Sequence, residues 1–70
     1  MRIEEIDYRI CKIIKKYKET YKKNPSVKDI AKIICYTNQG TLYHLKKLES
    51  VGIVERTDDS KYKLLVNNVK

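Results

Sequence analysis

The segment spanning residues 37–54, TNQGTLYHLKKLESVGIV, is the sequence feature that most constrains the fold. Placed at the 100° per residue of an α-helix, it has two unlike sides. Thr41, Leu45 and Leu48 fall on one side, which is suited to a core. The opposite side carries amide, phenol, ammonium and hydroxyl groups and no acid: Gln39, Tyr43, Lys46, Lys47 and Ser50. The pattern predicts an amphipathic helix over residues 38–51, with Leu45 and Leu48 as central core residues.

Both ends of this predicted helix are marked. Thr37 or Asn38 can cap its start, because their side-chain oxygens accept hydrogen bonds from free backbone N–H groups. Gly52 can end it in a left-handed conformation, after which Ile53 would fold back onto Leu48. Gly40 lies inside the first turn, where glycine costs about 1 kcal/mol relative to alanine. Two interpretations stay open for Gly40: close approach of the backbone to a phosphate, or a loose first turn.

The polar side of this helix carries the kinds of groups with which proteins bind a groove of a nucleic-acid duplex. Ammonium groups contact phosphates, and planar or hydroxylated groups contact base edges. Leu42 lies near its exposed edge, where it could touch a thymine methyl group or another protein. His44 lies on the border of the buried side, and we expect a packed, hydrogen-bonded histidine there rather than a pH switch or a phosphate contact.

The first helix is predicted over residues 3–22. Apolar side chains recur there at spacings of three and four, which indicates one core-facing stripe. The stripe comprises Ile3, Ile6, Ile10, Ile13 and Tyr17, widened by Ile14 and Tyr21. Tyr8 falls opposite the stripe and is expected to be exposed.

A second helix is predicted over residues 26–35, after Asn24-Pro25 breaks the helical pattern. Ser26 and Asp29 have the spacing of a capping box. Its buried face is predicted to comprise Val27, Ile30, Ile33 and Ile34, with Lys28 and Lys32 pointing away. Two short helices joined by a tight turn form the helix-turn-helix arrangement.

The period changes from 3.6 to 2 after Gly52, which predicts a β-hairpin over residues 53–66. Its strands are residues 53–56 and 62–66, joined by the turn formers of residues 57–60. Val54, Tyr62 and Leu64 are expected to face inward. We therefore expect residues 1–70 to form a single domain, mainly α with a C-terminal hairpin, in the α+β class.

The net charge of +7 and the pI of about 9.5 favour a polyanionic partner. No catalytic residues are predicted, because one histidine and no phosphate-cradling glycine loop give no convergent set of groups. The ligand count is too low for a metal site, and no cofactor or small-molecule ligand is evident. No apolar run has the length of a membrane span, so we expect a cytoplasmic protein.

Two cysteines occur, Cys11 and Cys35, and both lie among apolar residues. We expect both to be small reduced core side chains. A bridge between them stays open as the rarer alternative, because intracellular disulfides are uncommon.

Two segments carry a resemblance to a known family. The first is residues 24–31, NPSVKDIA, and the second joins HLKKLE at residues 44–49 to GIV at residues 52–54. The chain resembles winged helix-turn-helix domains, closest in pattern to the amino-terminal domain of the LexA repressor and to MarR-like regulators. The resemblance covers residues 6–65 and implies a three-helix fold in which the hairpin is the wing.

The resemblance implies that residues 38–51 form a recognition helix in the major groove of double-stranded DNA. Together with the polar side of that helix, it gives these candidate DNA-binding residues: Ser26, Lys28, Thr37, Asn38, Gln39, Thr41, Tyr43, Lys46, Lys47, Arg56, Lys61 and Lys63. One departure from the family is the acidic wing tip, Asp58-Asp59, so any wing cations must come from its flanks.

We therefore expect a sequence-specific DNA-binding transcription regulator, a small repressor in the simplest case. The alternative is a winged helix that serves as a protein-interaction module. A homodimer is a further expectation, because one copy of so small a module makes few base contacts. The candidate dimer surface comprises Ile3, Ile6, Tyr8 and residues 66–69.

Overall fold

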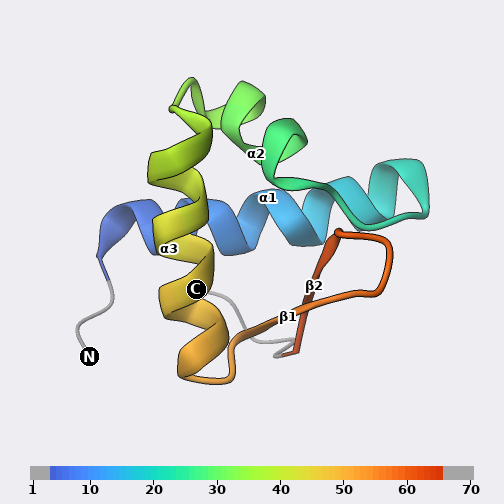
Figure 1. Ribbon diagram of the computed structural model, residues 1–70. Helices are drawn as coiled ribbons and strands as arrows, with labels where there is room; N and C mark the ends of the chain where they lie inside the picture. Colours follow the sequence, from blue (N-terminus) through green and yellow to red (C-terminus); the bar gives the residue numbers. More distant parts are fainter. Residues whose placement is uncertain (1–3, 66–70) are drawn as a thin grey trace.

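The computed structural model describes residues 4–65 and contains three helices followed by a two-stranded antiparallel sheet. The elements are α1 (Glu5–Tyr21), α2 (Val27–Ile34), α3 (Asn38–Ser50), β1 (Val54–Arg56) and β2 (Tyr62–Leu64). In Figure 1, α3 crosses in front of α1, α2 lies above α1 and beside the upper end of α3, and the hairpin lies beside the lower end of α3. The predicted α+β, mainly helical winged-helix layout is confirmed. The predicted dimer residues Ile3 and 66–69 lie outside the described residues.

One small core joins all five elements. Leu45 and Leu48 of α3 have no exposed surface, as predicted. They belong to a cluster that draws on both other helices and both strands: Ile10, Cys11, Ile14, Ile30, Leu45, Leu48, Val54 and Tyr62. The predicted inward residues Val54 and Tyr62 are buried, and Leu64 packs against the cluster.

The helix ends follow the local chemistry of the sequence. The Gly40 N–H donates to Thr37 Oγ1 over 3.0 Å, so Thr37 and not Asn38 caps α3. At the other end, the Ile53 N–H donates to the Leu48 carbonyl over 2.9 Å. The Gly52 N–H donates to the Glu49 carbonyl over 3.1 Å, and Gly52 has a φ of 80°. This pair of bonds is the Schellman motif, which requires the left-handed conformation that glycine adopts without strain.

The start of α2 is tied to the wing. The predicted capping box is present: the Asp29 N–H donates to Ser26 Oγ, and the Ser26 N–H donates to Asp29 Oδ2. The Tyr62 N–H donates to the Pro25 carbonyl over 2.8 Å, and Ser26 forms an isolated antiparallel bridge with Lys61. The turn before α2 therefore acts as a short third strand beside β2.

Three predictions of burial are wrong. Ile33 is 51% exposed and Tyr21 is 59% exposed, although both continue the apolar stripes of their helices. Cys35 is exposed at the end of α2, where it has a φ of 57°, whereas Cys11 is buried as expected. Both cysteines are free thiols. The core is smaller than the stripes of α1 and α2, so each stripe runs past its edge.

Leu48→Ala should lower the free energy of unfolding by about 2–5 kcal/mol, because it opens a cavity where the three helices and the hairpin meet. Urea unfolding followed by circular dichroism measures this. Val51→Ala is the control on the following turn, since Val51 is 43% exposed and should change stability by less than about 0.5 kcal/mol. Equal effects of the two substitutions would contradict the packing described here.

Candidate nucleic-acid interface

A concave surface lies where the start of α2, the side of α3 and the hairpin meet. It encloses a hollow of about 570 Å³. The lining residues are Ser26, Val27, Lys28, Leu42, Lys46, Glu49, Arg56, Ser60 and Tyr62. Four of the predicted DNA-binding residues, from three separate elements, are thus brought together: Ser26, Lys28, Lys46 and Arg56. We call this surface the α2–α3–wing hollow.

The exposed side of α3 continues from this hollow. Asn38, Gln39 and Lys46 are exposed, and Tyr43 is 64% exposed. Gln39, Tyr43 and Lys46 are spaced by four and three residues, so they lie along one side of the helix. The helix thus presents an amide, a phenol and an ammonium group in a row.

The description of this side as free of acid is wrong. Glu49 is exposed and lines the α2–α3–wing hollow three residues after Lys46. Leu42 is half-buried and packs against the core, so it forms an apolar floor of the hollow rather than a free surface residue.

Two predicted DNA-binding residues of α3 do not reach its outer side. Thr41 has no exposed surface, and its Oγ1 has no hydrogen-bond partner among residues 4–65. The Lys47 side chain is only 7% exposed. The placement of Lys47 on the outer side is therefore wrong, because the ammonium group turns inward toward the start of α1.

A buried carboxylate draws Lys47 inward. Lys47 Nζ lies 2.6 Å from Asp7 Oδ2 and 2.9 Å from Glu4 Oε2. The Glu4 backbone N–H also donates to Asp7 Oδ2, over 2.7 Å. His44 Nδ1 lies 2.9 Å from Asp7 Oδ1, and since an ionised carboxylate only accepts, Nδ1 carries the proton and donates. The prediction of a packed, hydrogen-bonded His44 is confirmed.

The ionisation of this network follows from its contacts. Burial opposes the charge on Asp7, but hydrogen bonds from Lys47, the Glu4 N–H and His44 outweigh it and lower the pKa of Asp7. Hydrogen bonds to Asp7 and then Glu4 raise the pKa of Lys47, against the effect of burial. Asp7 and Lys47 are therefore an ion pair at neutral pH, and together with His44 they tie α3 to the start of α1.

Glu4, Asp7 and His44 also have metal-binding chemistry, with one ligand atom of each lying within 4.8 Å of the others. The Lys47 ammonium group is hydrogen-bonded to both carboxylates, so it already supplies the positive charge at this position. The arrangement is that of a salt-bridge network that fixes two helices.

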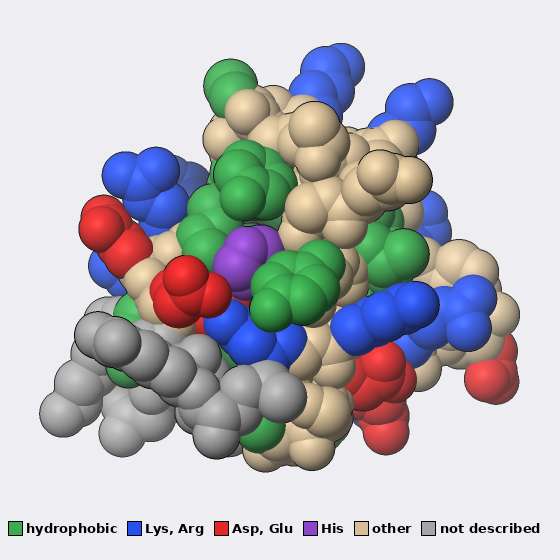
Figure 2. Space-filling view, turned by 60° about the vertical axis from the view of Figure 1, so that its left-hand side comes forward, with side chains coloured by type: hydrophobic (Ala, Val, Ile, Leu, Met, Phe, Trp, Pro, Cys, Tyr) green, Lys and Arg blue, Asp and Glu red, His purple; other side chains and the backbone are tan. Residues whose placement is uncertain are grey.

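Two tyrosines border His44 at the surface. The ring centroids of Tyr43 and Tyr36 lie 5.2 Å and 6.0 Å from that of His44. Figure 2 shows the histidine, in purple, among green hydrophobic side chains. The Tyr36 ring also lies against Gly40: a Cβ at residue 40 would lie 2.5 Å from a carbon of that exposed ring, so the ring would have to move. This close packing is a further reason for a glycine at position 40, beside the two interpretations offered from the sequence.

The three cationic residues predicted on the wing do not lie on one surface. Arg56 lines the α2–α3–wing hollow and donates to Ser60 Oγ over 3.1 Å. Lys61 is half-buried beside Ser26. Lys63 is ion-paired with Glu55 at 3.1 Å and lines a different hollow, between α1 and β2. Lys63 therefore does not join the other predicted residues.

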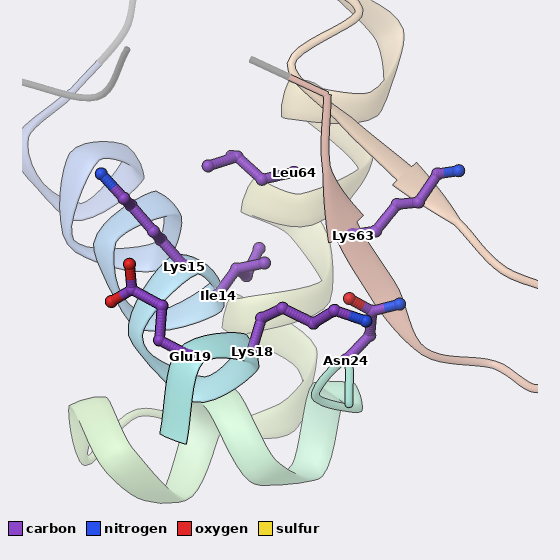
Figure 3. Close-up of a pocket in the computed structure, with 7 residues that line it drawn as sticks. All are labelled: Ile14, Lys15, Lys18, Glu19, Asn24, Lys63 and Leu64. Carbon is purple, nitrogen blue, oxygen red and sulfur yellow. The ribbon is translucent and has the colours of Figure 1, made fainter. Parts of the chain in front are cut away.

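This second hollow has a volume of about 480 Å³ and a mixed lining: Ile14, Lys15, Lys18, Glu19, Asn24, Lys63 and Leu64. In Figure 3, the side chains of Lys15 and Lys63 point in opposite directions, and α3 lies behind the hollow. The ammonium groups do not converge on one point, so the geometry does not favour a small anionic ligand here.

The chain matches no model of a known protein family, and no curated protein matches it. Within residues 4–65, no helix is long and apolar enough to cross a membrane. The layout of three helices and a hairpin is compatible with a winged helix.

Asp7→Asn should lower the free energy of unfolding by about 3 kcal/mol, because it leaves the inward-turned Lys47 ammonium group without its closest partner. Urea unfolding at neutral pH measures the loss. Glu5→Gln is the matched control: the Glu5 side chain is 86% exposed and only 3.8 Å from Arg9, so its loss should change stability by less than about 0.5 kcal/mol. A similar small loss for Asp7→Asn would show that the network does not hold the helices.

The stability of the protein should fall in acid partly through Asp7. Since its folded-state pKa is lowered, its contribution is present above the ordinary value of 3.8 and is lost as pH falls through the lower folded pKa. Unfolding measured between about pH 5 and pH 2 should therefore show a steeper decline for the wild type than for Asp7→Asn. Parallel curves would mean that Asp7 titrates alike in the folded and unfolded chains.

Proposed function

We propose that the protein is a sequence-specific double-stranded DNA-binding regulator of transcription that places α3 in the major groove. The observation that carries this proposal is the α2–α3–wing hollow, in which Lys28, Lys46 and Arg56 face one concave surface beside the exposed side of α3. A concave surface edged by cations suits the phosphates on either side of a groove.

The charge of this surface supports a polyanion. The hollow has three cationic side chains, Lys28, Lys46 and Arg56, and one carboxylate, Glu49. The whole chain carries a net charge of +7. Its cations would displace counterions from DNA, which favours association and makes it salt-dependent.

The groups on α3 match base recognition. Gln39 can make paired hydrogen bonds to adenine, and Lys46 can donate to guanine. Tyr43 extends the same side, and Thr37 and Asn38 are exposed at the start of the helix. Thr41 and Lys47 have no part in this proposal, because both are buried.

The resemblance to LexA-type and MarR-like domains supports repression as the simplest mode of action, by occupation of an operator.

A homodimer on two half-sites would add the contacts that one module lacks. Tyr8, which is 47% exposed on α1, belongs to the described part of the expected dimer surface. Sedimentation of the complex with a selected duplex tests this, and one protein on a site without symmetry would contradict it.

Selection of bound duplexes from a random pool should yield a defined site. On that site, Lys46→Ala should weaken binding and reduce the slope of log affinity against log salt by about 0.9 for a lost phosphate contact. If Lys46 instead reads a base, the salt slope changes little and the sequence preference relaxes at one base position.

Gln39→Ala should relax the sequence preference at one base position, at a cost of about 1–3 kcal/mol of discrimination. Fluorescence anisotropy over a salt series measures these effects.

Lys32→Ala is the control for Lys46→Ala, because Lys32 is an exposed lysine of α2 that does not line the hollow. It should leave both site preference and affinity nearly unchanged. Absence of saturable binding to any duplex would reject the proposal and favour the protein-interaction module. Equal effects of Lys32→Ala and Lys46→Ala would show that binding depends on overall charge and not on this surface.

A further inference from the structure

The apolar stripes of α1 and α2 run past the core and meet in a groove. Ile33 of α2 and Tyr21 of α1 are more than half exposed, although the helical pattern predicts burial of both. They border a depression of about 330 Å³ between the two helices. The lining residues of this depression, the α1–α2 groove, are Ile13, Lys16, Tyr17, Thr20, Tyr21 and Ile33.

The walls of the α1–α2 groove are held in place. The rings of Tyr17 and Tyr21 pack together with centroids 4.6 Å apart. The Tyr17 hydroxyl lies 3.4 Å from Asp29 Oδ2, which links α1 to α2 across the groove. Asp29 is itself fixed by the Ser26 N–H and hydroxyl group. The groove is therefore a preformed surface, so a partner would lose little affinity in ordering it.

Isolated exposed apolar side chains need no explanation, but a contiguous group of them marks an interaction site. Here an isoleucine from α2 and two tyrosines of α1, whose rings are in contact at an interplanar angle of 50°, share one depression. A tyrosine ring supplies a large apolar contact and a hydroxyl group, which is why tyrosine is enriched at protein interfaces.

The charge around the groove indicates the partner. Lys16 is the charged side chain in its lining. The adjoining segment of residues 15–23 carries five lysines and one acid, Glu19. The nearby carboxylate of Asp29 already accepts hydrogen bonds from Ser26 and Tyr17. A second copy of this chain would bring an equally basic segment against it, whereas an acidic partner would be attracted.

We propose that the α1–α2 groove binds an acidic amphipathic helix of another protein. The α1 residues of the groove run from Ile13 to Tyr21, a length of about 12 Å at 1.5 Å per residue. This length accommodates roughly two turns of a partner helix with apolar side chains at positions i, i+4 and i+7. Asp and Glu residues beside these anchors would face Lys16 and the lysines around it.

The groove shares no residue with the α2–α3–wing hollow, so the proposal does not depend on DNA binding. Helix α2 contributes Lys28 to the hollow and Ile33 to the groove, five residues apart and on different sides of the helix. The two surfaces can be occupied at once. A regulator bound to DNA through the hollow could therefore recruit a second protein through the groove.

A displayed library of helix-forming peptides of about 14 residues, roughly four turns, tests the proposal. Its positions vary among Ala, Leu, Phe, Glu and Lys, so that acidic and basic helices compete in the same pool. We expect enriched peptides to carry three apolar anchors at helical spacing and an excess of Glu. Enrichment of basic peptides, or of no peptide whose binding requires Ile33, would overturn the proposal.

Variants with matched controls locate the site. Ile33→Ser should weaken binding of an enriched peptide at least about tenfold, as loss of a central apolar anchor does. Tyr8→Ser is its control, since Tyr8 is a 47% exposed aromatic elsewhere on α1. Lys16→Glu should weaken binding of acidic peptides more than Lys12→Glu, because Lys12 is exposed but does not line the groove.

Thermal unfolding of each variant separates lost binding from lost folding, and these exposed positions should change the midpoint by only a few degrees. Equal effects of Ile33→Ser and Tyr8→Ser would overturn the assignment of the site. Sedimentation showing a dimer that Ile33→Ser abolishes would overturn the acidic partner in favour of a second copy. Retained binding of DNA by Ile33→Ser, with loss of peptide binding, would confirm that the two surfaces are separate.

Discussion

The charge on one buried carboxylate sets the position of α3 against α1. Asp7 has no exposed surface and accepts hydrogen bonds from Lys47, His44 and the Glu4 N–H. Loss of one partner of a buried charge is costly, so this network favours the arrangement of the two helices in which all the partners meet. The network thereby sets which side of α3 faces solvent. Lys47 turns inward, and Gln39, Tyr43 and Lys46 face outward.

The sequence predicted the order of elements, the caps of α2 and α3 and the central core residues, because these depend on local patterns. Ser26, Thr37 and Gly52 act within four residues of their positions, and Leu45 and Leu48 follow the helical period. It did not predict where the core ends. Ile33 and Tyr21 satisfy the same periodicity as buried residues, and only the packing of three short helices leaves them at the surface.

The candidate site was predictable in part for the same reason. Lys46 and Gln39 are exposed on the predicted side, but Lys47 was misplaced because its partner, Asp7, lies 40 residues earlier in the chain. A signal was available: Asp7 falls within the apolar stripe of its helix, and an acid there requires a cation or donor from another element. His44 and Lys47, three residues apart, supply both. Glu49 was missed although the helical period alone places it beside Lys46, three residues earlier, at the edge of the same side.

The bridge between Ser26 and Lys61 has a consequence for the modularity of the fold. A hairpin of three residue pairs is marginal in water alone, and a slip of one residue would turn Tyr62 away from the core. The bond from Tyr62 to the Pro25 carbonyl fixes the register from outside the hairpin. The wing therefore cannot be transplanted as a cassette without the turn that precedes α2. Changes in loop length at Asp58-Asp59, outside the bridge to Lys61, should be tolerated far better than any insertion between Asn24 and Ser26.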